Sequence, residues 1–315
     1  MLPPGMHGKV VRQGHRKWLS KGNVRLSEVP GAMLAGVLQA IGHPVPQEGL
    51  AALRFWGQTG ERPGAWMAAA DPVHLEARLD HLSLFALRGD AISRSDLGDL
   101  FAYLQRTLGD DERYTFVCRG RLGYLRGHAP IATAAVSPEM IDGRPPDEYM
   151  PAGASAAAHD KLLSELQMAL HDHEVNRQRA AVGERSVNSM WFWGGGTAPE
   201  KDTRPIPTLF ADDPLFRGYW DSCTGVIEDW TDNFDQCLSI APDGYVAVAP
   251  DELDFAQPSI LANHLENLRV VSNRGDLRKL TMLFRDGMNI EINNNDALRF
   301  WRRISPLLME PAHND

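Results

Sequence analysis

The stretch HEVNRQRAAVGERSVNSMWFWGGG, residues 173–196, decides the fold. A polar, helix-type sequence leads through Asn188-Ser189 into MWFW and then into three consecutive glycines. Because MWFW has no polar residue to alternate with, it is typical of a strand buried on both faces, and we expect Trp191 and Trp193 to be buried. Glycines after such a strand permit a close approach of the backbone. The stretch therefore predicts a buried strand with a tight exit, and the alternative is anion binding by the N–H groups of Gly194–Gly196.

The triple glycine does not fit a nucleotide-binding phosphate loop. Such a loop continues into Lys-Ser or Lys-Thr and opens a helix directly afterwards. Here Thr197-Ala198-Pro199 follows, and Pro205 and Pro207 come soon after.

The rest of the chain alternates between strand-type and helix-type segments. The apolar spacing predicts one long helix over residues 156–180. Residues 66–70 form an apolar segment that we expect to end at Asp71-Pro72. Residues 280–292 predict a β-hairpin with Asp286-Gly287 in its turn, and residues 293–304 predict a capped final helix. Strands that alternate with helices, together with hairpins, predict an α/β fold with a mixed sheet and flanking helices.

Charge is distributed unevenly along the chain. The net charge is −9, yet residues 1–25 contain only basic charged residues. We expect 1–25 to be a basic, poorly ordered arm and 26–315 to be a single α/β domain, with two lobes meeting near 137–155 as the alternative. The acidic balance makes nucleic acid an unlikely partner except for the arm, since nucleic-acid binders need a basic face.

The chain predicts a cytoplasmic protein. No apolar run reaches the roughly 20 residues that a membrane span requires. The start lacks the apolar core of a signal peptide. The three cysteines are scattered without a CxxC pair, which is typical of a reducing compartment and excludes a cysteine-built zinc site.

Two groups of polar residues are candidates for chemistry. His171 and His173 point about 200° apart on one helix, so they cannot share a metal ion unless the helix has ended. His173 and Asn176 lie near one helical face with either Arg177 or Arg179, and these residues are able to present donors to an anion. Asp71 and His74 form an acid–histidine pair, and the alternative role for both is to satisfy local backbone groups.

The run from residue 70 to residue 85 and the run from residue 164 to residue 196 resemble the bacterial regulatory protein RpfE family. The WFWGGG motif at residues 191–196 is specific to this resemblance, which covers about residues 50–305. It implies a regulatory protein from a gene cluster for virulence and cell–cell signalling.

The same segment is more distantly similar to archaeal-type cofactor-independent phosphoglycerate mutase. The matching positions are His173, Val175, Asn176, Arg179, Asn188 and Gly194–Gly196. This resemblance implies part of an alkaline-phosphatase-like fold, whose members transfer phosphate through a hydroxyl nucleophile beside two metal ions. The family's Asp-Gly metal ligand at the start is missing, since the first aspartate is Asp71, and only His264 and His313 follow His173.

The sequence thus predicts a non-catalytic, phosphoglycerate-mutase-like regulatory protein that binds a phosphorylated or carboxylated metabolite. It predicts no metal site and no cofactor, with Mn or Zn as the alternative. One alternative function is a metal-dependent phosphotransferase or phosphatase, and another is a module that binds a regulatory protein partner. The predicted ligand-binding residues are Asp71, His74, His173, Asn176, Arg177, Arg179, Asn188, Gly194, Gly195 and Gly196.

Overall fold

The structure, a computed structural model, describes residues 13–26, 33–110, 113–231, 233–250, 258–284, 287–299 and 301–308. The chain forms two compact units. Unit 1 is drawn from Met1–Val45, Asp202–Asp213 and Cys223–Asp315, and unit 2 from Pro46–Lys201 and Pro214–Ser222. The loop at 137–155, where the sequence placed the meeting point of two lobes, lies inside unit 2.

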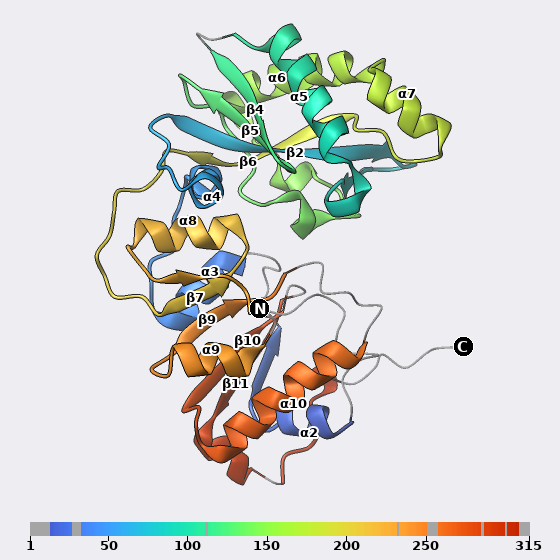
Figure 1. The fold of residues 1–315 in the computed structure, drawn as a ribbon. Coiled ribbons are helices and arrows are strands. Elements are labelled where there is room, and N and C mark those ends of the chain that lie inside the picture. The colour runs from blue at the N-terminus through green and yellow to red at the C-terminus, as the bar shows by residue number, and fades with distance from the viewer. Residues whose placement is uncertain are drawn as a thin grey trace. The chain divides into compact units, whose positions relative to one another are not determined.

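Unit 2 is built on an antiparallel sheet (Figure 1). Its central strand, β2, pairs with β5 over Trp66–Ala69 and with β3 over Val73–Ala77, and its other edge pairs with β6. The strands are β2 Trp66–Ala77, β3 Leu82–Ala86, β4 Tyr114–Arg119, β5 Leu122–Gly127 and β6 Ser189–Gly196.

The predicted end of the apolar segment at Asp71-Pro72 is wrong, because β2 runs through both residues. A proline lacks the N–H that a central strand normally donates to its neighbour. On β2 this position falls between the part paired with β5 and the part paired with β3, so no ladder bond to either strand is lost there.

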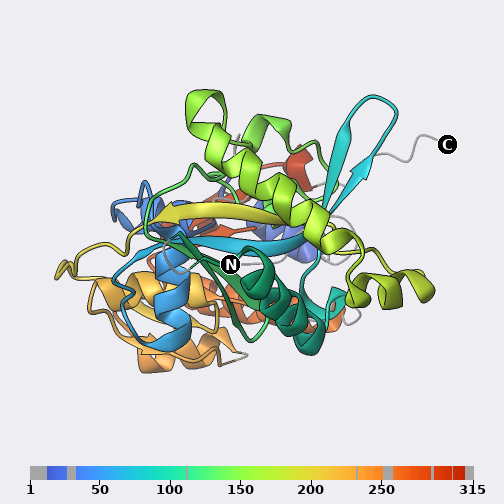
Figure 2. The same cartoon turned by 90° about the horizontal axis from the view of Figure 1, so that it is seen from above.

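Helices cover both faces of this sheet. Leu97, Leu166 and Phe192 belong to the core formed beneath α5, α6 and α7, and Figure 2 shows α5 and α6 on the same side of the sheet. The other face packs against α4 and the segment around Ala134 and Ile141. The helices of unit 2 are α4 Leu50–Thr59, α5 Arg94–Leu108, α6 Ala157–His171, α7 Glu174–Ala181 and α8 Pro214–Ser222, with 3-10 turns η1 Gly89–Ala91, η2 Pro138–Ile141, η3 Asp147–Tyr149 and η4 Gly153–Ala156.

The predicted single helix over 156–180 is two helices in the structure, α6 and α7. His173 adopts an extended conformation between them, with φ −67° and ψ 142°. The apolar spacing continues across both helices, but the polar side chain of His173 caps the start of α7 and so interrupts the helix.

The described residues of unit 1 form two small three-stranded sheets. One is parallel, in the order β8-β7-β9, and the other is antiparallel, in the order β1-β11-β10. The strands are β1 Asn23–Leu26, β7 Thr208–Ala211, β8 Ile227–Glu228, β9 Tyr245–Val248, β10 Lys279–Leu283 and β11 Met288–Asn293; the helices are α2 Gln13–Leu19, α3 Met33–Ile41, α9 Phe234–Ile240 and α10 Pro258–Arg274.

The predicted C-terminal hairpin is confirmed, since β10 and β11 pair in antiparallel register; Asp286 of its turn lies outside the described residues. The predicted final helix is wrong in extent. A capping box between Asn293 and Asp296 opens only a short 3-10 helix, η5 Asn294–Leu298, and a second, η6, spans Pro306–Leu308.

Part of the predicted basic arm is folded into unit 1. Residues 13–26 form α2 and β1, and Trp18 and Leu19 are buried in the core of this unit. His15 Nε2 lies 3.0 Å from a carboxylate oxygen of Glu266 on α10. Residues 1–12 of the predicted arm lie outside the described residues.

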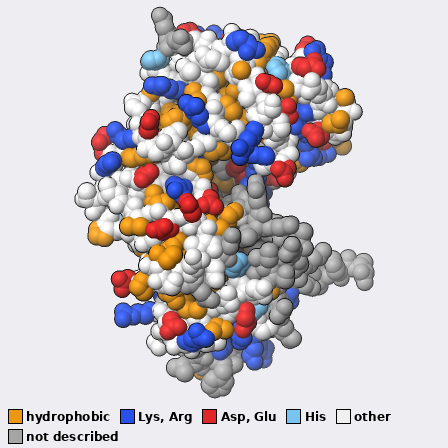
Figure 3. All heavy atoms as spheres, viewed as in Figure 1, with side chains coloured by type: hydrophobic (Ala, Val, Ile, Leu, Met, Phe, Trp, Pro, Cys, Tyr) orange, Lys and Arg blue, Asp and Glu red, His pale blue; other side chains and the backbone are white. Residues whose placement is uncertain are grey.

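With both kinds of sheet and helices in both units, the predicted α/β fold with a mixed arrangement of strands is confirmed. Among the helices that the structure describes, none has the length and hydropathy needed to cross a membrane. On the visible face of unit 2, Figure 3 shows basic and acidic side chains interspersed.

Candidate functional site

Asn176 on α7 closes the connection between the helices and β6. Its side-chain nitrogen donates to the carbonyls of Leu170 at 2.8 Å and Val187 at 2.9 Å. Its side-chain oxygen accepts from the Val187 N–H at 2.7 Å. The side chain is buried, and these three hydrogen bonds all join it to backbone groups of the protein. In the structure, this predicted ligand-binding residue therefore fastens the start of β6 to the end of α6.

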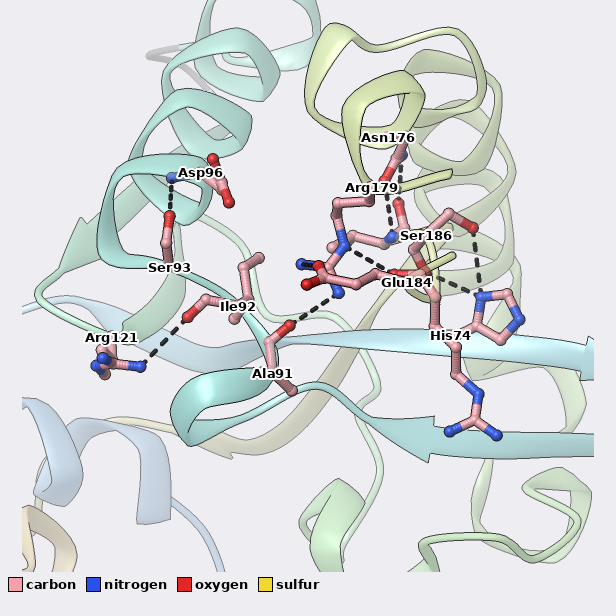
Figure 4. A network of polar contacts seen from close by, with 12 residues as sticks. His74, Ala91, Ile92, Ser93, Asp96, Arg121, Asn176, Arg179, Glu184 and Ser186 are labelled. Atoms are coloured by element: carbon pink, nitrogen blue, oxygen red, sulfur yellow. Dashed lines mark hydrogen bonds and ion pairs between the residues drawn. The ribbon is translucent and has the colours of Figure 1, made fainter. Parts of the chain in front are cut away.

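Arg179, one turn further along α7, is also engaged by the protein itself (Figure 4). Its Nε donates to the Arg185 carbonyl at 2.7 Å, and a terminal nitrogen donates to the Ala91 carbonyl at 2.8 Å. The other terminal nitrogen lies 3.1 Å from Glu184. Arg177, in contrast, is exposed and pairs with Glu174 on the same helix.

His74 and Asn188 tie the same connection to β2. His74 Nδ1 lies 2.9 Å from the Ser186 carbonyl oxygen (Figure 4). The Asn188 side chain accepts from the Leu75 N–H at 2.7 Å and donates to the Leu75 carbonyl at 2.8 Å. The structure thus brings His74, Asn176, Arg179 and Asn188 together around residues 182–188, where they hold a turn by its backbone.

His173 is the N-cap of α7. Its Nδ1 accepts a hydrogen bond from the Val175 N–H at 3.2 Å, and its ring lies against Tyr103 with 4.7 Å between ring centroids. Partial burial is the main cause that lowers the pKa of His173, and Arg106 and Arg177 add to it against the opposing effect of Asp99. A neutral ring is the form able to accept the capping bond.

We expect acid to weaken the cap of α7. Because the folded-state pKa of His173 is lowered, its contribution to stability is full above the ordinary histidine value of about 6.5 and is lost as the pH falls through that region. The loss is expected to stay below about 1 kcal/mol, since solvent screens a half-exposed side chain. Urea unfolding at pH 8 and pH 5 should show a smaller pH dependence in His173→Asn, which keeps a capping group, than in the unsubstituted protein. His171→Asn is the matched control, and an equal reduction there would contradict the assignment.

The triple glycine closes the far end of β6. A Cβ on Gly196 would lie 2.3 Å from the Gly49 nitrogen, and a Cβ on Gly194 would lie 2.9 Å from the Leu50 Cβ. The Gly49 N–H donates to the Gly195 carbonyl at 3.1 Å. Trp191 and Trp193 are each 5% exposed. The interpretation of this stretch as a buried strand with a tight exit is confirmed.

The predicted binding residues are therefore not gathered in one place. Asn188 and Gly194 stand at opposite ends of β6, roughly 20 Å apart at about 3.3 Å per residue. Asp71 lies on β2 beside Trp193, within a different set of contacts.

Asp71 forms a buried ion pair with Arg54 of α4, a residue that the sequence analysis missed. Arg54 Nη1 donates to Asp71 Oδ2 at 2.8 Å, and Nη2 donates to the Gly123 carbonyl at 2.8 Å. Trp193 Nε1 donates to the same Asp71 oxygen at 2.6 Å. Although burial opposes the charged guanidinium, Asp71 raises the pKa of Arg54 above its ordinary value. The signal in the sequence was an arginine inside the otherwise apolar segment LAALRFW.

A cavity of about 540 Å³ lies beside the glycine exit. Arg62 forms one wall: its Nε donates to the Pro199 carbonyl at 3.1 Å, and its Nη2 donates to the Ala198 carbonyl at 3.0 Å and to Glu200 at 2.7 Å. Gln47 and Glu48 also line this cavity. Thr197 and Ala198, which directly follow the triple glycine, line it as well.

No protein-family profile matches the chain. Among curated proteins, it is similar to 2,3-bisphosphoglycerate-independent phosphoglycerate mutases. The enzyme of Methanosarcina barkeri is 29% identical over 111 residues, which is 35% of this chain and 28% of the relative. The enzyme of Methanosarcina mazei is 34% identical over 68 residues, which is 22% of this chain and 17% of the relative. The matched segments thus span less than a third of these relatives' own length.

Two solved structures are similar over most of the chain. The cofactor-independent phosphoglycerate mutase from Thermoplasma acidophilum aligns with a TM-score of 0.41 and 16% identity, covering 95% of this chain and 86% of that one. The PH0037 protein from Pyrococcus horikoshii aligns with a TM-score of 0.50 and 12% identity, covering 95% of this chain and 84% of that one. At this identity, the likeness to PH0037 concerns the fold.

The prediction of no cofactor, to which Mn or Zn was the alternative, is contradicted by the relatives. The relatives need no bisphosphoglycerate, yet cofactor-independent mutases use metal ions. In the part of the chain that the structure describes, no group of three or more His, Cys, Asp or Glu side chains is placed to hold a metal ion, so the described residues do not fit such a centre. Asp212, a carboxylate that directly follows β7 of the parallel sheet, instead accepts a hydrogen bond from the Trp230 N–H at 3.2 Å. We therefore assign no chemical step to a metal ion.

The curated relatives that match in sequence are phosphoglycerate mutases. The resemblance to the RpfE family stays a prediction. Over about a third of its length, the chain is a distant relative of cofactor-independent phosphoglycerate mutase.

Proposed function

We propose that this protein is a non-catalytic relative of phosphoglycerate mutase that binds a phosphorylated or carboxylated metabolite and acts in regulation, as the RpfE resemblance implies. The observation that carries the proposal is the cavity beside the glycine exit, which Arg62 lines. The donors of Asn176, Arg179 and Asn188 are engaged by backbone groups of the protein, so we do not assign these residues to the ligand.

Arg62 supplies the donor for an anionic group. Its Nε and Nη2 are held by the carbonyls of Pro199 and Ala198 and by Glu200, which fixes the plane of the guanidinium. Within the described residues, no hydrogen bond involves Nη1. A planar guanidinium with a remaining donor suits a carboxylate or a phosphate.

The acidic residues of the cavity narrow the class of ligand. Glu48 and Glu200 both line it. Carboxylates accept hydrogen bonds from hydroxyl groups and repel anionic groups. We therefore expect a hydroxyl group of the ligand beside Glu48 or Glu200 and an anionic group beside Arg62. 3-Phosphoglycerate, with one hydroxyl group and two anionic groups, is a probe for this class of small hydroxylated phosphates and carboxylates.

The experiment is a calorimetric titration of the full chain with 3-phosphoglycerate and with inorganic phosphate. We expect saturable binding of 3-phosphoglycerate that weakens at least about tenfold in Arg62→Gln, the loss of one charge-assisted hydrogen bond. Arg177→Gln, on an exposed helix of the same unit, should bind as the unsubstituted protein does. A coupled mutase assay on the same samples should show no turnover.

Three outcomes would count against the proposal. Equal binding by Arg62→Gln would remove the cavity as the site. Turnover of 3-phosphoglycerate would replace the non-catalytic reading with the mutase-like enzyme. The absence of binding to either compound would favour the remaining alternative, a protein that acts through a regulatory protein partner.

A further inference from the structure

Strand β10 of unit 1 has β11 on one edge and no strand on the other. The Phe284 N–H donates to the Met288 carbonyl at 2.8 Å, and the Asn294 N–H donates to the Arg278 carbonyl at 3.2 Å. Successive residues of a strand direct their backbone groups to opposite edges. Every second residue of β10, counted from either of these bonds, therefore faces β11.

The residues between them, Lys279, Thr281 and Leu283, direct their backbone groups to the other edge of β10. In the part of the chain that the structure describes, no hydrogen bond reaches these outward N–H and carbonyl groups. Lys279 is exposed, and Thr281 and Leu283 are half-buried, so solvent has access to this edge. We call it the open edge of β10.

Edge strands of the unit 2 sheet are treated differently. On β4, the Phe116 N–H donates to the side-chain oxygen of Gln105 at 2.7 Å. On β3, the Leu84 N–H donates to the Arg144 carbonyl at 3.0 Å. Proteins usually cover or block an edge strand in this way, because its unpaired backbone groups invite pairing with another chain. The open edge of β10 lacks such a cover among the described residues and is available for pairing.

The open edge lines a groove in unit 1, which we call the β10 groove. This cavity of about 750 Å³ is bounded by β10, by residues of β9 and by helices α3 and α9 (Figure 1). Its volume falls within the range of roughly 300–1,000 Å³ that is typical of ligand-binding cavities. Apolar side chains that line it are Val37, Ile41, Leu238, Leu268 and Met282. The groove therefore offers apolar surface beside the unpaired backbone groups of β10.

An extended peptide is the ligand whose chemistry matches this surface. The outward groups of β10 recur at every second residue, about 6.7 Å apart, and the backbone of an extended peptide presents its own N–H and carbonyl groups at the same interval. In strand addition, main-chain hydrogen bonds supply affinity, and pockets for alternate side chains supply specificity. A second copy of β10 would bring β11 with it, whereas a groove that is also bounded by α3 and α9 suits a single segment without flanking structure.

The charged residues of the β10 groove favour a segment with a basic side chain. Asp243, shortly before β9, and Asp276, shortly before β10, both line the groove and are exposed. Lys279 pairs with Glu291 at 3.1 Å, whereas Asp243, Asp276 and Arg278 have no ion pair within the described ranges. Two carboxylates against one cation leave a net negative charge, which is complementary to lysine or arginine on the partner.

We propose that unit 1 binds an extended segment of a partner protein by adding it as a strand to the open edge of β10. The segment carries apolar side chains at alternate positions, which fill the β10 groove, and at least one basic side chain, which lies beside Asp243 and Asp276. This inference does not depend on metabolite binding, because the cavity lined by Arg62 belongs to unit 2.

The test begins with a display library of random eight-residue peptides selected on the full chain. We expect the selected peptides to alternate apolar with polar residues and to contain lysine or arginine. Their affinities are then measured by fluorescence anisotropy. Thr281→Pro should weaken binding at least about tenfold, since proline removes an outward N–H that β11 does not use. Thr281→Val, which keeps the backbone donor, should bind as the unsubstituted protein does.

Amide hydrogen exchange tests the geometry of the complex. A selected peptide should increase the protection of the Thr281 and Leu283 amides, which point to the open edge. The Met282 amide, which faces β11, should change little. Equal protection of all three amides would indicate binding that does not add a strand, and it would overturn the proposal.

A charge variant provides a second measurement in case Thr281→Pro folds poorly. Asp243→Asn/Asp276→Asn should weaken the binding of basic peptides and reduce its dependence on salt. Asp172→Asn, an exposed acid of unit 2, is the matched control and should have no effect. The proposal would also fail if the library yielded no binding peptide, or if the selected peptides bound Thr281→Pro and the charge variant with unchanged affinity.

Discussion

Arg54→Met is expected to destabilise unit 2 by about 3–5 kcal/mol, because it leaves the Asp71 carboxylate buried without its cation. Arg54 and Asp71 are 6% and 7% exposed, so water replaces little of the lost interaction. The guanidinium carbon of Arg54 lies 4.8 Å from the ring centre of Tyr124 and 5.2 Å from that of Trp193, so methionine, which replaces only the aliphatic stem, also loses these cation–π contacts. The measurement is urea unfolding followed by tryptophan fluorescence and circular dichroism.

Two further variants separate charge from packing. Arg177→Met removes an exposed arginine from its pair with Glu174 and should change stability little. The double variant Arg54→Met/Asp71→Asn should recover part of the loss, since no uncompensated charge remains buried. If Arg54→Met unfolded at the same urea concentration as the unsubstituted protein, the buried ion pair would not have the role assigned to it.

Gly196→Ala is expected to destabilise the protein by about 3 kcal/mol, from overpacking together with backbone strain. The added Cβ would lie 2.3 Å from the nitrogen and 2.8 Å from the Cα of Gly49. These are backbone atoms that cannot turn aside, and Gly196 has a φ of +150°, which side chains rarely adopt. The midpoint of urea unfolding and the yield of folded protein would register the change.

Gly98→Ala is the matched control for this substitution. Gly98 lies within α5, and no atom comes within 4 Å of an added Cβ. Alanine should stabilise that helix by roughly 0.5–1 kcal/mol, since glycine costs conformational entropy there. A Gly196→Ala protein as stable as Gly98→Ala would mean that the exit of β6 is not closely packed.

The parts of the fold that were predictable are those with a strong local pattern. The apolar run at Met190–Trp193 predicts a buried strand, and the structure has β6 there. The alternating residues on either side of Asp286-Gly287 predict the hairpin of β10 and β11. In both places, neighbouring residues alone specify the conformation.

The parts that were missed depend on contacts between distant residues. Asp71-Pro72 looks like the end of a strand, and only the change of partner from β5 to β3 shows why β2 continues. Nothing local to Arg54 indicates that its partner is Asp71. Asn176 looks like a surface donor on a polar helix until its bonds to Leu170 and Val187 are seen.

The candidate site was the least predictable feature. Residues grouped by their closeness in the sequence, such as Asn188 and Gly194, are separated by the length of an extended strand. Arg62 and Glu48 come together with Thr197 in one cavity although the sequence gives no sign of it. Residues that are close in the sequence lie far apart in space when an extended strand separates them. Residues that are remote in the sequence line one cavity when the fold brings their loops together.

The position of helix α8 in the sequence limits how the gene of this protein can be divided or recombined. The helix belongs to unit 2 although the residues immediately before and after it belong to unit 1. It packs closely against α4 through a glycine on each helix. A Cβ added to Gly57 of α4 would lie 2.0 Å from the Pro214 carbonyl oxygen of α8, and a Cβ added to Gly218 of α8 would lie 1.8 Å from the Leu53 carbonyl oxygen of α4. A gene fragment encoding residues 46–201 alone would lack this helix and would expose the face of α4 that receives it. Neither unit is therefore a contiguous module that evolution or an engineer can transplant with a single pair of breakpoints.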